Sequence, residues 1–129
     1  MLVVPSYKDY RDIPGGYIHH GETPTQAAVR ETREELGITP PIGRLLVTDW
    51  APNHEEGDKL LFIFDGGILS SKYRESIRLA PDELTAYAFH EVASARELTI
   101  SRLACRIIHG HAAHHDGTIR YLEHGRPIS

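Results

Sequence analysis

The clearest hydrophobic patterns in the chain are two β-rich runs separated by an acidic loop. Ile42 to Trp50 and Lys59 to Phe64 are rich in apolar, β-favouring residues and are bounded by turn residues, so they predict the two longer strands. The loop between them, Ala51 to Asp58, is acidic. Shorter strands are predicted at Leu2 to Val4, Tyr17 to His19, Ala86 to His90 and Ile119 to Leu122.

Helix signals alternate with these strands. Thr23 and Gln26 form the two halves of a capping box, Pro24 suits the first helical turn, and Gly37 suits the left-handed position after the last turn. A helix is therefore predicted from about Pro24 to Leu36. A short helix is expected over Glu91 to Arg96, and a longer one over Ile100 to about His114 with Leu103, Ile107 and Ile108 on its apolar side.

The first helix carries three glutamates on one face. At about 100° per residue, Glu31, Glu34 and Glu35 fall together, beside small alanines. The opposite face consists of Val29, Thr32 and Leu36. Like charges at this spacing repel by a few tenths of a kcal/mol per pair. A cation bound between the glutamates would turn this repulsion into a net attraction. Oxygen ligands favour Mg²⁺, with Mn²⁺ as the second candidate, over zinc.

A solvated acidic helix face is the alternative interpretation of these glutamates. The capped ends, the preceding Gly15-Gly16 loop and the spacing together favour a metal site. Arg30 has two candidate partners, Glu34 four residues later and Glu22 at the other end of the loop. Either pairing would fix the position of a carboxylate.

The spacing from Gly16 to Ile38 resembles the Nudix box of the Nudix hydrolases. The matching positions are Gly16, Glu22, Arg30, Glu31, Glu34, Glu35, Gly37 and Ile38, whereas Thr32 stands where the family usually has a bulky aliphatic residue. The resemblance implies an α/β/α sandwich with a mixed β-sheet. It also implies cleavage by water of a pyrophosphate bond in a nucleoside diphosphate linked to another moiety.

The resemblance also implies roles for individual residues. Glu31, Glu34 and Glu35 would bind the divalent metal, the carbonyl of Gly16 would be a further ligand, and Glu22 and Arg30 would support them. The loop around Glu83 would bring in another carboxylate. The general base is then one of the helix glutamates or Glu83, because close carboxylates titrate as a coupled set.

The N-terminal region is shorter than the family pattern implies. Only fifteen residues precede Gly16, and Leu2 to Val4 resembles the second strand of the usual first hairpin. We therefore expect the usual first strand to be missing. Either translation starts further upstream, or a second copy of the chain covers the exposed edge in a homodimer.

Length and composition set further bounds. A chain of 129 residues with 40% hydrophobic and 25% charged residues predicts one domain, residues 1–129. A formal net charge of -4 gives no support for nucleic-acid binding. The single cysteine, Cys105, excludes an intramolecular disulfide, and no apolar run suits a signal peptide or a membrane span. We expect a cytoplasmic protein with a small-molecule nucleotide substrate.

Three further groups of residues have weaker claims to function. The acidic residues Glu55, Glu56 and Asp58 are rivals to Glu83. His109, His111, His114 and His115 lack a cysteine partner, so helix-end histidines near the dipole are favoured over a closed zinc site. Trp50, Tyr7 and Tyr10 are candidates for nucleobase stacking, but packing of these rings in the core or at its rim is favoured.

Two functions of other classes compete with hydrolysis. A Nudix-fold module that senses a nucleotide without cleaving it would be favoured by loss of a box carboxylate, but all are present. An isomerase on the same fold would need a catalytic cysteine near the site, and Cys105 in the late helix is poorly placed for that role.

Overall fold

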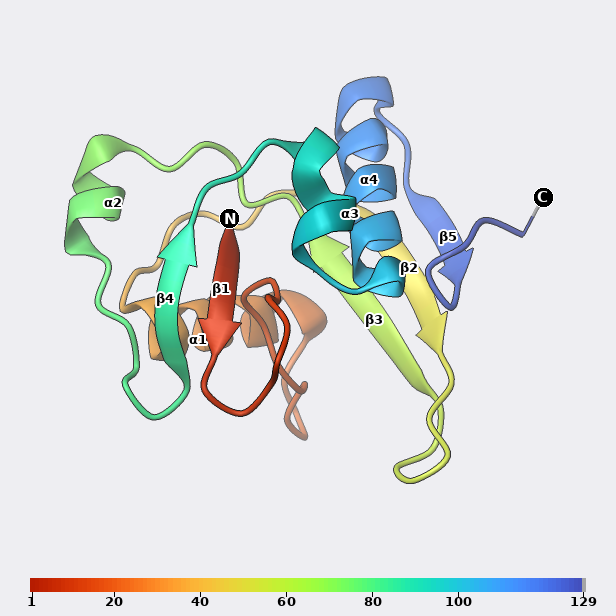
Figure 1. Cartoon of the computed structure of the whole chain (residues 1–129), viewed down its shortest axis with the longest axis horizontal. Coiled ribbons are helices and arrows are strands. Elements are labelled where there is room, and N and C mark those ends of the chain that lie inside the picture. The colour runs from red at the N-terminus through yellow and green to blue at the C-terminus, as the bar shows by residue number, and fades with distance from the viewer. Residues whose placement is uncertain (129) are drawn as a thin grey trace. The chain divides into compact units, whose positions relative to one another are not determined.

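The computed structural model describes residues 1–128 and divides the chain into two compact units. The first unit comprises Met1–Gly43 and Gly66–His90, and the second comprises residues 44–65 and 91–128. Helices and strands are interspersed along the chain, as Figure 1 shows by colour from red to blue. The predicted mixed α/β class is confirmed. The single domain, the sandwich layering and the missing first strand stay predictions.

In the first unit, β1 (Leu2–Pro5) pairs with β4 (Leu84–Ala88) in an antiparallel ladder that places Val3 opposite Tyr87. The chain after β1 turns back, so that Val3 also exchanges two backbone hydrogen bonds with Asp12, of 2.8 and 2.9 Å. β4 begins two residues earlier than the strand expected from Ala86. The β1 edge opposite β4 is therefore partly covered by the chain's own loop.

The strand predicted at Tyr17 to His19 is not formed. Side chains take the backbone groups that a neighbouring strand would have paired. Arg30 donates to the carbonyl of Tyr17 at 2.8 Å, and the His19 N–H donates to Glu22 at 2.9 Å. The β-favouring residues here thus belong to an irregular loop that is tied to the following helix.

Helix α1 (Pro24–Leu36) has the predicted bounds and caps. The Thr23 hydroxyl accepts from the Gln26 N–H at 3.1 Å, the Gln26 side chain accepts from the Thr23 N–H at 2.9 Å, and Gly37 follows with φ 71°. Its Leu36 is buried in the core of the first unit, together with Val3, Ile38, Ile77 and Leu84.

Helix α2 (Ser71–Ser76) was not predicted from the sequence. The Ser70 hydroxyl caps its start by accepting from the Tyr73 N–H at 3.3 Å. With six residues it is too short to show a hydrophobic period, so only the serine cap signals it. Tyr73 packs against the core of the unit.

The second unit is built on a three-stranded sheet in the order β3-β2-β5. Strand β2 (Leu45–Ala51) is antiparallel to β3 (Lys59–Phe64) and parallel to β5 (Arg120–Glu123). β3 has the predicted bounds and β5 lies one residue later than predicted. β2 begins at Leu45 rather than Ile42.

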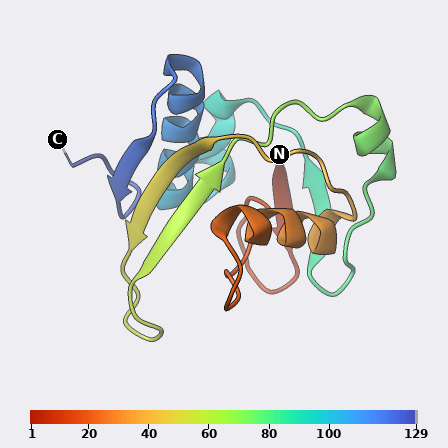
Figure 2. The ribbon, with the colours of Figure 1, turned by 180° about the vertical axis from the view of Figure 1, so that it is seen from behind.

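Helix α4 (Ser101–Asp116) packs on one face of this sheet, as Figures 1 and 2 show. Gly110 faces β2, where a Cβ would make an ordinary van der Waals contact of 3.6 Å with a Val47 methyl. The core consists of Leu46, Val47, Ala113 and Leu122. The predicted short helix before α4 is a 3₁₀ turn, Val92–Ser94, followed by α3 (Ala95–Leu98).

A buried ion pair joins Asp49 of β2 to Arg106 of α4 in the second unit. Asp49 is fully buried and accepts hydrogen bonds from Arg106 Nε and from the backbone N–H of Gly125, the latter at 3.0 Å. Gly125 has φ 79°, and a Cβ on it would lie 2.8 Å from the Arg102 carbonyl oxygen. Glycine is therefore required where the C-terminal turn closes over Asp49. Within the part of the chain that the structure describes, no helix is both long and apolar enough to cross a bilayer.

Candidate active site

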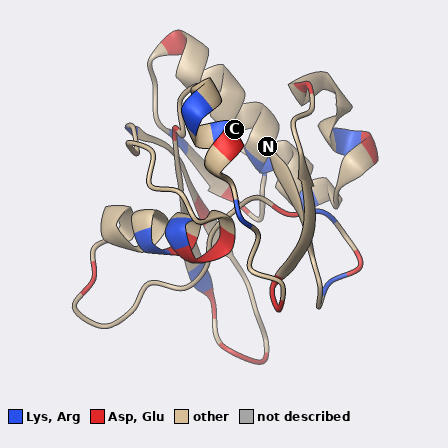
Figure 3. Cartoon of the chain, turned by 90° about the vertical axis from the view of Figure 1, so that its left-hand side faces the viewer, with Lys and Arg blue, Asp and Glu red and all other residues tan. Residues whose placement is uncertain are grey.

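Arg30 of α1 gathers the carboxylates of the box. Its Nε donates to Glu22 at 2.8 Å, while its Nη1 donates to Glu31 at 2.8 Å and to Glu34 at 3.1 Å. Both partners left open by the sequence are therefore used. Basic and acidic residues alternate along this part of α1 (Figure 3). Because the guanidinium is planar and pre-organised, it fixes the three carboxylates relative to one another.

Glu22 is held in its ionised form. Hydrogen bonds from Arg30 and from the His19 N–H lower the pKa of Glu22 to about 2. The same contact with Glu22, together with Glu31, raises the pKa of Arg30 above its ordinary value. The loop from Tyr17 to Glu22 is thus anchored to α1 by charge-assisted hydrogen bonds at any pH near neutrality.

Glu35 departs from the exposed acidic face that the helical period predicted. Its side chain is buried, with 6% of the residue exposed, and its Oε1 accepts from the Gly15 N–H at 2.7 Å. Burial raises the pKa of Glu35 to about 7 against the lowering effect of the Gly15 hydrogen bond, and repulsion from Glu31, Glu83 and Asp12 adds to the rise. Glu35 is buried because the loop that ends at Gly15 lies against its carboxylate.

Gly16 lies directly against Glu31. A Cβ built on Gly16 would come within 2.5 Å of the Glu31 carboxylate carbon and Oε1. Any side chain at this position would therefore displace the carboxylate. The contact brings the backbone of the loop next to an acidic side chain.

These residues are chemically suited to a hard divalent cation. Arg30 uses Oε1 of Glu31 and Oε2 of Glu34, and Gly15 uses Oε1 of Glu35, so each carboxylate keeps a second oxygen for a metal. Mg²⁺ binds oxygen ligands and commonly keeps several waters. Within residues 1–128, no three His, Cys, Asp or Glu side chains are arranged as a complete metal site, and the Glu34 side chain is 46% exposed.

Glu83 lies close enough to Glu35 to repel its charge, which makes it a reasonable further carboxylate at this site. Its backbone carbonyl accepts from the Ser6 N–H at 2.9 Å, and the Ser6 hydroxyl donates to the Asp82 carbonyl at 2.8 Å. The rivals Glu55, Glu56 and Asp58 lie in the second unit. There the Asn53 side chain accepts hydrogen bonds from the backbone N–H groups of Glu55 and Glu56.

Sequence reasoning missed Lys8 in the loop between β1 and the box. Its Nζ lies 2.6 Å from Asp12 Oδ2 and 5.4 Å from the ring centroids of both Tyr7 and Tyr10. Tyr7 is 69% exposed; partial desolvation of its hydroxyl raises its pKa against the lowering effect of Lys8, and Glu35 and Glu83 add to the rise. The aromatic pair flanking a lysine, with an aspartate four residues on, was the available signal.

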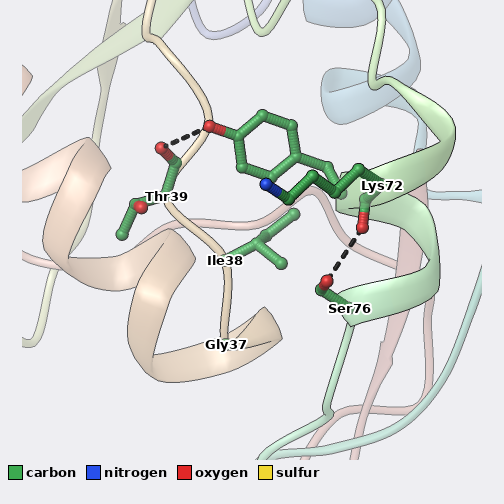
Figure 4. Close-up of a pocket in the computed structure, with 6 residues that line it drawn as sticks. Gly37, Ile38, Thr39, Lys72 and Ser76 are labelled. Atoms are coloured by element: carbon green, nitrogen blue, oxygen red, sulfur yellow. Dashed lines mark hydrogen bonds between the residues drawn. The ribbon is translucent and has the colours of Figure 1, made fainter.

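A cavity of about 280 Å³ lies elsewhere in the first unit, beside the end of α1 (Figure 4). It is lined by Gly37, Ile38, Thr39, Lys72, Tyr73 and Ser76. The Tyr73 hydroxyl donates to the Thr39 carbonyl at 3.4 Å. None of the described residues that line it is acidic, so it does not share the chemistry of the carboxylate site.

The NUDIX domain model matches residues 1–107. The chain belongs to the Nudix family. The 8-oxo-dGTP diphosphatase of Escherichia coli (strain K12) is 66% identical over 29 residues, which is 22% of this chain and 22% of that protein. This match therefore spans only a small part of either protein, and it leaves the activity of the Nudix chain to be proposed.

Three solved structures resemble the Nudix chain, each at 20% sequence identity. The MutT protein from Methanosarcina mazei Go1 has a TM-score of 0.69, with 90% of this chain and 83% of that chain covered. An Ap4A hydrolase from C. elegans has a TM-score of 0.65, with 90% of this chain and 86% of that chain covered. A UDP-X diphosphatase has a TM-score of 0.68, with 94% of this chain and 59% of that chain covered. At this identity the likeness concerns the fold, and it confirms the mixed α/β fold expected from the box.

Proposed function

We propose that this chain hydrolyses a pyrophosphate bond in a nucleoside diphosphate linked to another moiety. The observation that carries the proposal is Glu35, a buried carboxylate with a pKa near 7, which lies within the influence of Glu31 and Glu83. Such a group is costly to leave without a counter-charge and is suited to binding a cation or exchanging a proton near neutral pH. Family membership supports the reaction class.

Each residue of the site has a role in this proposal. Glu31, Glu34 and Glu35, with the Gly16 carbonyl, would hold Mg²⁺ or Mn²⁺, which when bound neutralises phosphate charge and lowers the pKa of water. Arg30 and Glu22 keep these ligands in position. Glu83 or one of the helix glutamates takes the proton from the attacking water.

The loop that begins at Ser6 and ends at Gly15 supplies the substrate contacts in this proposal. One end is bonded to the Glu83 backbone and the other to the Glu35 carboxylate. Lys8 would exchange its contact with Asp12 for a phosphate oxygen, and the exposed ring of Tyr7 would pack on the base or the second moiety.

The competing proposal is a Nudix-fold sensor that binds a nucleotide without cleaving it. The presence of Glu31, Glu34 and Glu35 favours the enzyme. A panel of 8-oxo-dGTP, nucleotide sugars, dinucleoside polyphosphates, ADP-ribose and nucleoside triphosphates, each with Mg²⁺, separates the two. Metal-dependent release of a nucleoside monophosphate by the wild type and not by Glu35→Gln supports hydrolysis. Tight binding without product supports the sensor.

We also propose that the chain forms a homodimer. β4 pairs with β1 on one edge, and among residues 1–128 it pairs with no other strand. An unpaired edge with Tyr87 and Phe89 exposed nearby favours association with another strand. Sedimentation of the purified chain tests this proposal, and a monomer at all concentrations would contradict it.

A further inference from the structure

The last turns of α4 bring two histidine side chains together in the second unit. His111 and His115 are four residues apart and both are exposed. Their Nε2 atoms lie 3.1 Å from each other, and their rings are nearly perpendicular at 85° with centroids 4.4 Å apart. The same nitrogen of each ring thus lies next to its counterpart.

The separation of these nitrogens matches the spacing of two ligands on one metal ion. A metal–imidazole bond is about 2.0–2.1 Å long, so two such bonds at a right or tetrahedral angle separate the nitrogens by about 2.9–3.4 Å. The observed 3.1 Å falls within that range. A metal could therefore bind both nitrogens at nearly their present separation.

The chemistry of the pair also favours a cation. Without a metal, the contact is a hydrogen bond when the Nε2–H of one ring donates to the bare Nε2 of the other. When a metal binds the Nε2 lone pairs of both neutral rings, each ring carries its own proton on Nδ1. The pair lies in the last turns of α4, where the helix dipole stabilises positive charge.

Neighbouring residues restrain this pair and leave the remaining metal positions to solvent. His114 is held by Asp65 at 2.6 Å, and its ring contacts His115 edge-on with centroids 5.5 Å apart. Asp116 is engaged with Thr118 and Arg120. No third His, Cys, Asp or Glu of residues 1–128 completes the site, so water would fill the other positions.

We propose that His111 and His115 form a two-histidine binding site for Zn²⁺, Ni²⁺ or a similar divalent transition metal, separate from the carboxylate site on α1. Imidazole nitrogen selects these metals, whereas Mg²⁺ takes oxygen ligands. The closed four-ligand zinc site weighed from the sequence is a different arrangement. This one is open and uses two of the four late histidines.

Calorimetric titration of the metal-free whole chain with Ni²⁺ tests the site. The tightest Ni²⁺ site of the wild type should have an affinity at least about tenfold above that of the tightest site in His111→Ala/His115→Ala. The control is His54→Ala/His90→Ala, which removes two other exposed histidines and should bind as the wild type does. Equal affinities, within about threefold, in the wild type and in the His111/His115 variant would overturn the proposal.

Single variants and competition sharpen this test. Because the two rings act as one chelate, His111→Ala and His115→Ala should each lose nearly as much affinity as the double variant. Independent, additive losses would instead mean separate single-histidine sites and would refute the pair. Excess Mg²⁺ should not displace Ni²⁺, and paramagnetic Ni²⁺ should first broaden the ring signals of His111 and His115. Circular dichroism of each variant checks that the exposed substitutions leave the fold intact.

Discussion

The backbone N–H of Gly15 donates a 2.7 Å hydrogen bond to Oε1 of Glu35, twenty residues further along the chain. This single contact joins the loop before the box to the last turn of α1. It draws one glutamate of the acidic face into the protein and leaves Glu34 at the surface. The box glutamates therefore differ in environment although their spacing makes them look equivalent.

Glu35→Gln should abolish most turnover while preserving the fold. The amide keeps the size of the side chain and can still accept from Gly15, but it removes the charge proposed to hold the metal. A loss well beyond tenfold, worth about 1.4 kcal/mol of barrier, is expected in kcat with the substrate found in the screen. Activity within about threefold of wild type would count against a metal role.

The same substitution should stabilise the metal-free chain at alkaline pH. The pKa of Glu35 is raised from 4.5 to about 7 in the folded state, so the folded state holds the proton more tightly than the unfolded chain. That contribution favours folding below about pH 4.5 and is lost as pH rises through about 7.

Urea unfolding in chelator at pH 5 and pH 8 measures this effect. The free energy of unfolding of Glu35→Gln, minus that of the wild type, should be more positive at pH 8 than at pH 5. The expected increase is on the order of 1 kcal/mol, after allowance for water near the carboxylate. Glu34→Gln, at an exposed position, is the control. A difference that does not change with pH would show that burial of Glu35 has no electrostatic cost.

Gly16→Ala should impair the site more than the fold. The added methyl would lie 2.5 Å from the Glu31 carboxylate, which must move away. We expect weaker Mg²⁺ binding and slower turnover, with a small change in the thermal midpoint. Gly66→Ala is the matched control, because its Cβ would meet nothing within 4 Å. If both variants keep wild-type Mg²⁺ affinity, the Gly16–Glu31 contact has no role in the site.

Lys8→Met should raise KM more than it lowers kcat. Methionine keeps an apolar stem against Tyr7 and Tyr10 but cannot contact phosphate. A several-fold rise in KM, of the size expected when a charge-assisted hydrogen bond is lost, is predicted. Lys59→Met, which removes a lysine paired with Glu56 in the second unit, serves as the control. An unchanged KM in Lys8→Met would exclude the proposed phosphate contact.

Asp49→Asn should strongly destabilise the chain. It leaves the buried Arg106 charge without its partner, and Arg106 Nη2 already has no hydrogen-bond partner within residues 1–128. Removing one member of a buried pair typically costs about 3–5 kcal/mol. Chemical unfolding measures this loss. Asp116→Asn, which breaks the exposed pair with Arg120, should change stability little, and equal effects of the two substitutions would contradict this account.

The features that sequence predicted well depend on neighbouring residues. The capping box at Thr23, the glycine at position 37 and the β-rich run Lys59–Phe64 each act over a few residues, and each appears as predicted. The pairing of Arg30 with Glu22 and Glu34 also follows from short spacings.

The features that sequence missed depend on contacts between distant segments. Burial of Glu35 requires Gly15, and the loss of the strand at Tyr17 requires Arg30 to take its carbonyl. Hydrophobic and charge patterns along one segment carry no information about such partners.

The hydrogen bond from Gly125 to Asp49 has a consequence for the order in which the second unit forms. The two residues are separated by 76 positions, so β2 is synthesised long before the turn that caps its buried carboxylate. Until that turn and the parallel strand β5 arrive, a growing chain must keep Asp49 hydrated and one edge of β2 open. Newly made chains therefore pass through a stage in which this edge of β2 is open to pairing with other strands.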